Sequence, residues 1–206
     1  MSSLIYESSS TFTVPKGVKK IDVFCVGGGG GRKGSSAAGG GYTTTVLGAS
    51  VTPGQQLSVV VGAGGDTGFY NSNINNGGDS SIGEICSAKG GKGSDGTADG
   101  SDGGSGAGCF GSAGGQDGHD GASKNDYGWY GGKGQGTTTR YFGESTGTLY
   151  STGGCGSGWF GGAGLYCEKT PNTGDGATGL PPSSGTPSGY DYDGASGICI
   201  IRWSGK

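Results

Sequence analysis

Aromatic side chains gather in the segments that interrupt this glycine-rich chain, and they are the residues best suited to bind a ligand. Tyrosine and tryptophan offer rigid, amphipathic contact area at a low entropic cost, and their rings stack on the faces of sugars. Asparagine and aspartate beside them can hydrogen-bond hydroxyl groups. We therefore predict that loop aromatics bind a glycan or a protein. The residues of this predicted surface are Tyr127, Trp129, Tyr130, Tyr141, Phe142, Tyr150, Tyr190 and Tyr192.

Other aromatic residues have a structural interpretation. Phe110, Trp159 and Phe160 lie within glycine runs, where a large ring would seal the end of a packed segment and protect frayed backbone hydrogen bonds. Trp203 lies in an apolar run, which indicates either a core residue or a joint to another part of an assembly.

The carboxylates and the single histidine form no recognisable catalytic pattern. A glycosidase needs two carboxylates at a fixed separation in a cleft, whereas the aspartates here flank glycines, and we expect their side chains to be solvated. His119 has no nucleophile motif nearby. Residues 90–95 fit the start of a calcium-binding nonapeptide, but nothing repeats nine residues later. We expect a non-enzymatic protein without metal or cofactor. The aspartates concerned are Asp95, Asp99, Asp102, Asp117 and Asp120.

Charge and hydropathy exclude several classes of partner. The formal net charge is −3, and there is no basic stripe of the kind that binds nucleic acid or anionic membranes. No apolar run approaches the ~20 residues of a transmembrane helix, so we expect no membrane insertion. Residues 1–12 lack the basic and apolar regions of a secretory signal peptide. The 6 cysteines show no zinc-knuckle spacing. Their even number permits disulfides, but we favour mostly buried, free thiols.

Glycine indicates the fold. Of the 206 residues 55 are glycine, and between 62 and 197 many recur at every third position, as do Gly90, Gly93 and Gly96. A period of three fits neither an α-helix nor a β-strand. It fits the polyproline-II type of helix, with three residues per turn and a rise of about 3.1 Å. The interruptions and the scarcity of proline exclude collagen.

These short runs predict an intrachain bundle of polyglycine-II rods joined by turns. Such a helix has no internal hydrogen bonds, so neighbouring rods must supply partners for every buried N–H and C=O group. Glycine allows the backbones to approach closely enough. A disordered Gly/Ser linker is the alternative, but linkers lack aromatic residues at rod boundaries.

The two ends of the chain are typical of β-structure, and no segment has the period of an α-helix. We predict a mostly irregular, all-β protein in which a small β lobe, residues 1–61 plus 198–206, acts as a scaffold for a glycine-rich bundle, residues 62–197. The last strand should pair with the N-terminal strands. The predicted strands are 11–14, 20–26, 42–47, 56–61 and 198–203.

An ordered set of short motifs spans nearly the whole chain. It comprises Phe12–Pro15, Ile21–Phe24 before a run of glycines, Val51–Gln55, Val61–Gly65, Gly77–Gly83 and Gly197–Trp203. This set resembles the glycine-rich domains of phage and prophage tail proteins. The architecture is also similar to that of the tail-fibre adhesins of T-even-like phages, in which variable loops alternate with glycine-rich segments and recognise the host surface.

The resemblance implies a receptor-binding adhesin at a tail-fibre tip. The β lobe would join a shaft protein of the fibre, with Trp203 as a candidate joint, and the loop aromatics would bind a glycan or protein of the host cell surface. The protein would belong to the virion and be extracellular on release. One alternative is a structural protein of the cell surface, or of an extracellular filament, whose rods self-associate. A more remote alternative is ice binding by a flat face of the bundle.

Overall fold

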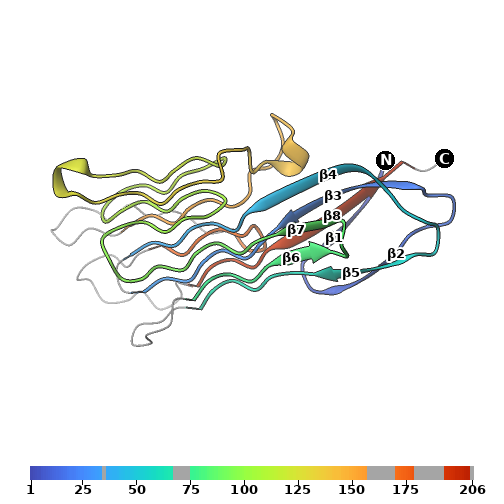
Figure 1. Cartoon of the computed structure of the whole chain (residues 1–206), viewed down its shortest axis with the longest axis horizontal. Helices are drawn as coiled ribbons and strands as arrows, with labels where there is room; N and C mark the ends of the chain where they lie inside the picture. The colour runs from blue at the N-terminus through green and yellow to red at the C-terminus, as the bar shows by residue number, and fades with distance from the viewer. Residues whose placement is uncertain (34–35, 67–74, 157–169, 179–192, 205–206) are drawn as a thin grey trace.

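The computed structural model describes residues 1–33, 36–66, 75–156, 170–178 and 193–204. The molecule is elongated, with β-sheets at the end that carries both termini and glycine-rich segments at the other end (Figure 1). The described helices are two 3-10 turns, η1 (Asn125–Tyr127) and η2 (Tyr141–Gly143). The predicted all-β and irregular class is confirmed. Among the described residues, no helix has the length and apolarity needed to cross a membrane.

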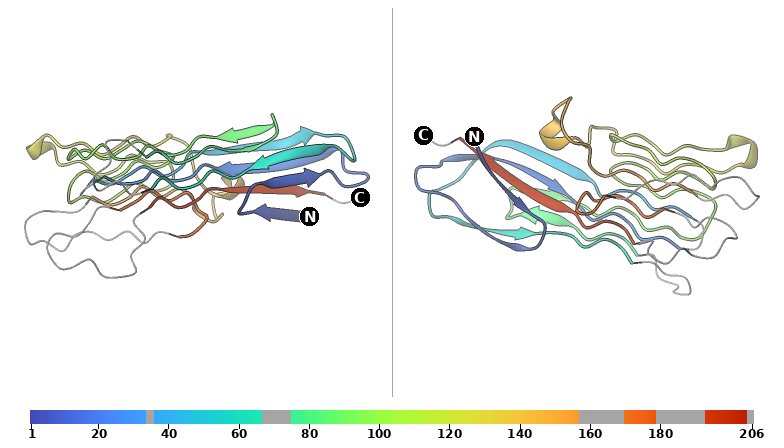
Figure 2. Two further views of the ribbon diagram at one scale, coloured as in Figure 1. Left: turned by 90° about the horizontal axis from the view of Figure 1, so that it is seen from below. Right: turned by 180° about the vertical axis from the view of Figure 1, so that it is seen from behind.

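Two antiparallel four-stranded sheets form the β lobe, and they lie against each other as two layers (Figure 2). The first sheet has the order β1 (Ser2–Tyr6), β8 (Ile198–Trp203), β3 (Lys20–Val26) and β4 (Thr43–Ser50). The second has the order β2 (Ser10–Thr13), β5 (Gln56–Val60), β6 (Ser80–Ile82) and β7 (Cys86–Ala88). The predicted pairing of the last strand with N-terminal strands is confirmed, because β8 lies between β1 and β3.

The hydrophobic core lies between the two sheets. Alternate residues of β3, such as Ile21 and Val23, point into it and meet Phe12 of β2 and Ile82 of β6. Phe24, the next residue after Val23, points to the opposite face of the first sheet, where a second apolar cluster covers it. Both faces of β3 are therefore buried, which explains its nearly unbroken apolar sequence.

The strand β3 runs directly into a rod formed by residues 27–31, whose hydrogen bonds have a period of three. The N–H groups of Gly27 and Gly30 donate to one neighbouring segment, and those of Gly28 and Gly31 donate to a second. Residues three apart point to the same neighbour only when the helix has three residues per turn. From residue 27 to residue 31, the acceptors are the carbonyl oxygens of Tyr42, Gly78, Ala195, Gly39 and Asn75, at 2.8–3.0 Å.

The carbonyl groups of this central rod accept bonds from three further segments. From residue 28 to residue 31, the donors are the N–H groups of Gly91, Gly65, Ala177 and Ser94, at 2.8–3.0 Å. The rod therefore has six neighbours, and its bonds radiate in all directions as in a hexagonal lattice. The predicted polyglycine-II bundle is confirmed by this pattern. Five of the six neighbours are continuations of the strands β4, β5, β6, β7 and β8.

The β lobe and the bundle interleave along the sequence more than the predicted boundaries suggest. Residues 27–41 of the predicted β lobe lie among the rods, and β6 and β7 of the predicted bundle lie in the second sheet. The strands β1, β6 and β7 were not predicted. The last two have three residues each, which is too short for an alternating pattern to stand out.

Aspartate side chains cover an edge of the bundle where a rod has no neighbour among the described segments. Carboxylate oxygens of Asp99, Asp102 and Asp120 accept the N–H groups of Tyr130, Lys133 and Gly134, at 2.7, 2.8 and 2.9 Å. Asp95 and Asp117 likewise accept the N–H groups of Thr97 and Thr139. These side chains are exposed or partly exposed, in line with the prediction that they are solvated. The prediction did not include their second role, which arises because an unpaired N–H at a rod edge needs an acceptor.

Lysine side chains complete this network on the bundle surface. The Nζ of Lys92 lies 2.7 Å from Asp102, and the Nζ of Lys133 lies 2.6 Å from Asp120. The hydrogen bonds from Lys133 and Gly134 lower the pKa of Asp120. Partial burial acts to raise the pKa of Asp102, but its bonds with Lys92 and Lys133 outweigh that effect and lower it. The carboxylates are thus held in the ionised form.

Replacing a glycine of the central rod should disrupt the bundle. A Cβ at Gly29 would lie 2.0 Å from the carbonyl oxygen of Asp175, so we expect Gly29→Ala to lower the free energy of unfolding by more than about 3 kcal/mol. Gly54→Ala is a suitable control, since its Cβ would meet nothing within 4 Å. The only cost of this substitution is the left-handed backbone, with a φ of +82°, which should lower the free energy of unfolding by about 1 kcal/mol. Equal unfolding midpoints for the two variants in urea would contradict the close packing of the rods.

The edge aspartates should make the bundle sensitive to acid. Their pKa values are lower in the folded protein than the ordinary 3.8, so their stabilisation is present above about pH 4 and is lost as the pH falls through the depressed values. We expect the thermal midpoint to stay level from pH 7 to about 5 and to fall below about 4. Asp102→Asn should weaken this dependence. A midpoint that is constant between pH 5 and pH 2.5 in calorimetry would show that the carboxylate bonds contribute nothing.

Candidate functional site: an aromatic cluster at the distal end

A tight turn at the end of the bundle displays the aromatic segment 127–130. The 3-10 turn η1 lies at the end of the molecule opposite both termini (Figure 1). Lys124 and Trp129 close this turn through two backbone bonds, from Lys124 N to Trp129 O at 2.9 Å and from Trp129 N to Lys124 O at 3.2 Å. Gly128 follows η1 in the left-handed region with a φ of 67°, which a residue without a Cβ adopts readily.

Four aromatic residues gather there and form what we name the distal aromatic cluster: Phe110, Tyr127, Trp129 and Tyr130. The rings of Tyr127 and Trp129 are stacked, with centroids 4.9 Å apart. Phe110 meets Trp129 edge to face at 5.4 Å. Tyr127 and Tyr130 remain 68% and 58% exposed. Two of the eight predicted site residues, Tyr127 and Trp129, therefore stack on each other, and Tyr130 follows them in the chain. Phe110, which we predicted to seal a rod end, packs against the ring of Trp129.

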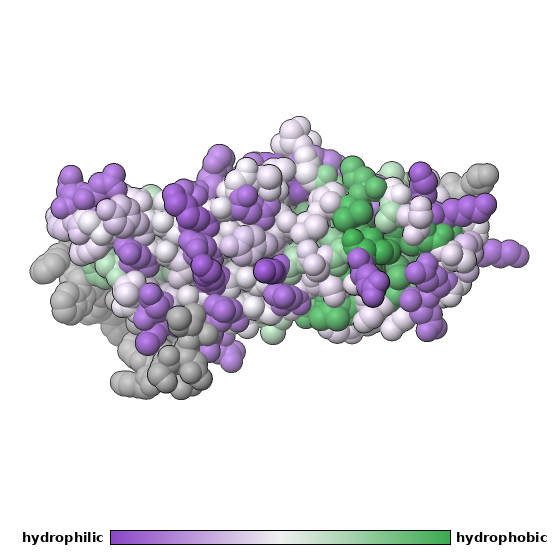
Figure 3. Space-filling model, viewed as in Figure 1, coloured by the Kyte–Doolittle hydropathy of each residue, from purple (hydrophilic) through white to green (hydrophobic). Residues whose placement is uncertain are grey.

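Polar groups surround the distal aromatic cluster. Asn125 and Asp126 are exposed beside Tyr127. The backbone of the adjacent rod is held in place by Asp99, which accepts the N–H of Tyr130, and by the hydroxyl of Ser123, which accepts the N–H of Gly131 at 2.8 Å. Figure 3 shows mainly polar and neutral residues over the glycine-rich end, whereas an apolar patch lies over the sheets. The cluster thus combines flat apolar rings with hydrogen-bonding groups.

Phe142 and Tyr150 do not belong to an exposed binding surface, contrary to the prediction. They are 4% and 9% exposed, and their rings lie 5.6 and 5.3 Å from that of Phe24 on the outer face of the first sheet. Burial also raises the pKa of Tyr150. Tyr141 is half-buried against the same Phe24. The segment folds back because the second face of β3 is apolar and needs a cover. Tyr190 and Tyr192 lie outside the described residues.

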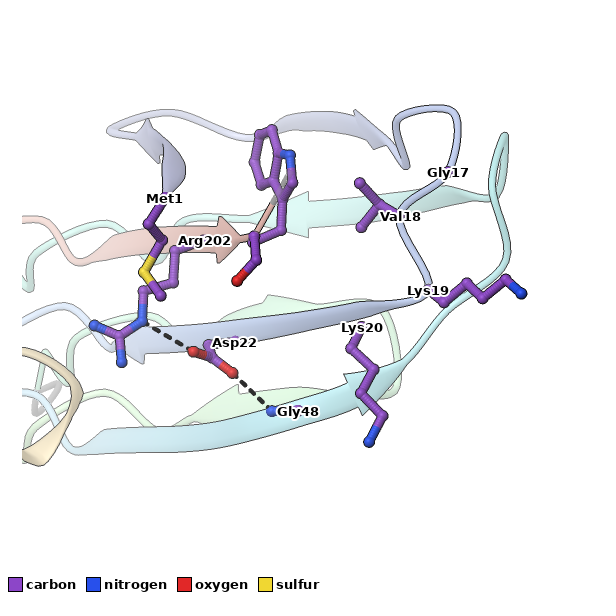
Figure 4. A pocket seen from close by; sticks show the side chains of 10 residues that line it. Met1, Gly17, Val18, Lys19, Lys20, Asp22, Gly48 and Arg202 are labelled. Carbon is purple, nitrogen blue, oxygen red and sulfur yellow. Dashed lines mark hydrogen bonds and ion pairs between the residues drawn. The ribbon is translucent and has the colours of Figure 1, made fainter. Parts of the chain in front are cut away.

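A pocket of about 390 Å³ lies at the end of the molecule opposite the distal aromatic cluster (Figure 4). Arg202 borders it and is held 3.0 Å from Asp22 and 2.6 Å from Glu144. Partial burial acts to lower the pKa of Arg202, but the bonds to both carboxylates outweigh that effect and raise it. Trp203 also lines the pocket and packs against Phe12, so it is partly a core residue as well as a surface residue. No motif in the sequence indicated this pocket.

Most of the described cysteines are free and buried, as the sequence predicted. Cys25, Cys86, Cys109 and Cys199 are free and buried. Cys155, however, is disulfide-bonded, which corrects the expectation of free thiols at that position. Within the described ranges, no three His, Cys, Asp or Glu side chains are grouped so that they could hold a metal ion.

Comparison with known proteins places the chain in a family. No curated protein matches it in sequence. A family model described as "Glycine-rich domain" matches residues 5–204, which is nearly the whole chain and includes the sheets, the rods and the distal aromatic cluster. The chain therefore belongs to the family of glycine-rich domains.

Proposed function

We propose that this protein is a non-enzymatic adhesin that recognises a bacterial cell-surface glycan or protein at the tip of a phage or prophage tail fibre. The observation that carries this proposal is the stacking of the exposed Tyr127 on the half-buried Trp129, in a turn at the end of the molecule opposite both termini. A binding surface at that position can reach a target while the other end stays attached.

A glycan suits the distal aromatic cluster better than an extended protein surface. One face of Tyr127 is occupied by Trp129, and its high exposure leaves the other face for the apolar side of a sugar ring. Asn125 and Asp126 can hydrogen-bond hydroxyl groups next to that ring. Among the described residues, those visible over this end of the molecule in Figure 3 are mainly polar or neutral, unlike the broad hydrophobic centre of a protein interface.

The pocket beside Trp203 is the proposed attachment site for the fibre shaft. It lies at the end that carries both termini, and it combines the indole ring with the cationic side chains of Lys19 and Lys20. An aromatic anchor rimmed by charged groups is a common feature of protein interfaces. This arrangement supports a location in the virion, with the distal aromatic cluster directed outward.

A structural protein that self-associates is the second candidate. The observation that favours it is the edge strand β1, which pairs with β8 alone and exposes Leu4 and Ile5, the latter by 60%. Residues 2–6 contain neither lysine nor proline, the usual protection of an edge strand. The described rod edge at residues 130–134, in contrast, is covered by aspartates, which disfavours the predicted association through that edge. Filaments of the pure protein in electron microscopy would favour this candidate over the adhesin.

Removal of the exposed tyrosine ring should abolish glycan binding without unfolding the protein. We expect Tyr127→Ala to weaken binding on an array of bacterial polysaccharides at least about tenfold, because stacking on one ring contributes about 1.4 kcal/mol or more. Leu47→Ala is the matched control, since Leu47 is similarly exposed at 61% but lies in β4, away from the tip. Equal binding by both variants, at unchanged circular dichroism, would refute the proposal.

A further inference from the structure

Two buried thiols face each other across neighbouring strands of the first sheet. Cys25 of β3 and Cys199 of β8 are directly opposite in the antiparallel register. Their sulfur atoms lie 3.8 Å apart, and both residues are completely buried. Because residues opposite each other in a sheet share a face, both side chains point into the core between the sheets.

The antiparallel register of this pair is compatible with a disulfide. Opposite residues of an antiparallel pair have Cα atoms about 4.5 or 5.5 Å apart, and both values lie within the ~4.4–6.8 Å range of disulfides. The two sulfur atoms need to approach by only about 1.8 Å from their present 3.8 Å to reach the bonding distance of ~2.05 Å.

The surroundings lower the reactivity of the thiols in the folded protein, so their oxidation is slow. The hydrogen bonds of Cys25 with Cys199 and Cys86, together with burial, raise the pKa of Cys25. The thiol of Cys199 also contacts the carbonyl oxygen of Val60 in the second sheet at 3.3 Å. Cys86 belongs to the second sheet and contacts the carbonyl oxygen of Thr44 at 3.5 Å. Because Cys86 also hydrogen-bonds Cys25, it is the thiol that could compete with Cys199 for a disulfide with Cys25.

We propose that Cys25 and Cys199 form a latent oxidation site, which a small two-electron oxidant such as hydrogen peroxide converts into a cross-strand disulfide that locks the β lobe. The inference is independent of what the distal aromatic cluster binds. The bond would join the third and the eighth strand, which come from opposite ends of the sequence.

The reaction proceeds in two balanced steps. One thiol, as its thiolate, attacks an oxygen atom of the peroxide, becomes a sulfenic acid and releases hydroxide. The second thiolate then attacks the sulfenic sulfur, the S–S bond forms, and the oxygen leaves as water once protonated. In total, two thiols lose two electrons and two protons, and one peroxide is reduced to two waters.

The consequence is a covalent link between residues far apart in the sequence. The loop between positions 25 and 199 contains both the bundle and most of the second sheet. A bond that closes so long a loop restricts the unfolded chain strongly. The protein would thus fold with reduced thiols in a reducing compartment and become locked after transfer to an oxidising one.

Mass spectrometry of the oxidised full chain tests this directly. The protein is incubated with hydrogen peroxide at neutral pH, alkylated with iodoacetamide while unfolded in urea, and digested with trypsin without reduction. The positions of lysine and arginine separate Cys25 in peptide 21–32, Cys199 in peptide 170–202 and Cys86 in peptide 34–89. We expect the first two peptides to be linked and the thermal midpoint to rise by about 5 °C or more, with dithiothreitol reversing both changes.

Two variants make the result specific. Cys86→Ala should keep the link and the rise in thermal midpoint, whereas Cys199→Ala should lose the rise. The inference is wrong if Cys25 is linked to Cys86 instead, if peptides 21–32 and 170–202 are recovered alkylated after prolonged oxidation, or if they carry sulfinic or sulfonic acids without a link. A link without any rise in midpoint would likewise exclude the proposed locking of the lobe.

Discussion

The structure depends on one constraint: the amide groups of each rod must be satisfied by other rods at a distance that excludes side chains. In the central rod, a Cβ at Gly28 or Gly29 would lie 2.0 Å from a carbonyl oxygen of a neighbour. The rods can therefore approach closely enough to form these hydrogen bonds only where the residue has no Cβ. The bonds contribute modestly, about 0.5–1.5 kcal/mol each, while ordering a residue costs about 1–2 kcal/mol and more for glycine. Rods without a scaffold would have little reason to assemble.

The β lobe provides that scaffold because its strands continue into the rods. Residues 27–31 extend β3, and five of the six neighbours of this rod extend strands of the same two sheets. The apolar core between the sheets fixes the strands in two layers. The rods thus leave the lobe in fixed positions, already beside the segments with which they exchange hydrogen bonds. The stability of the bundle is therefore coupled to a hydrophobic core that lies outside it.

Local periodicity predicted much of this fold, and contacts between distant segments account for what it missed. The period of three predicted the rods, and strands with a clear apolar pattern were found, whereas three-residue strands such as β6 carry too little pattern. An aromatic residue in an interruption is either a displayed ring or a cover for the core. Tyr127 and Phe142 look alike in this respect, and the difference is set by Phe24 and Ile200, two positions on strands from opposite ends of the chain. The hydrogen bonds of the aspartates could not be predicted either, because they depend on which rods lie at an edge of the bundle.

The spacing of glycines in a rod is related to the position of that rod, at the centre or at the surface of the bundle. The central rod has neighbours in every direction, and it consists of the unbroken run 27–31. A rod at the surface has neighbours on one side, so two of every three positions can carry a side chain. In residues 118–121, for example, the two glycines are buried and His119 and Asp120 between them are exposed. A repeat of one glycine in three is therefore the pattern of a surface rod, and the side chains between its glycines are the positions where the bundle can change its surface without changing its packing.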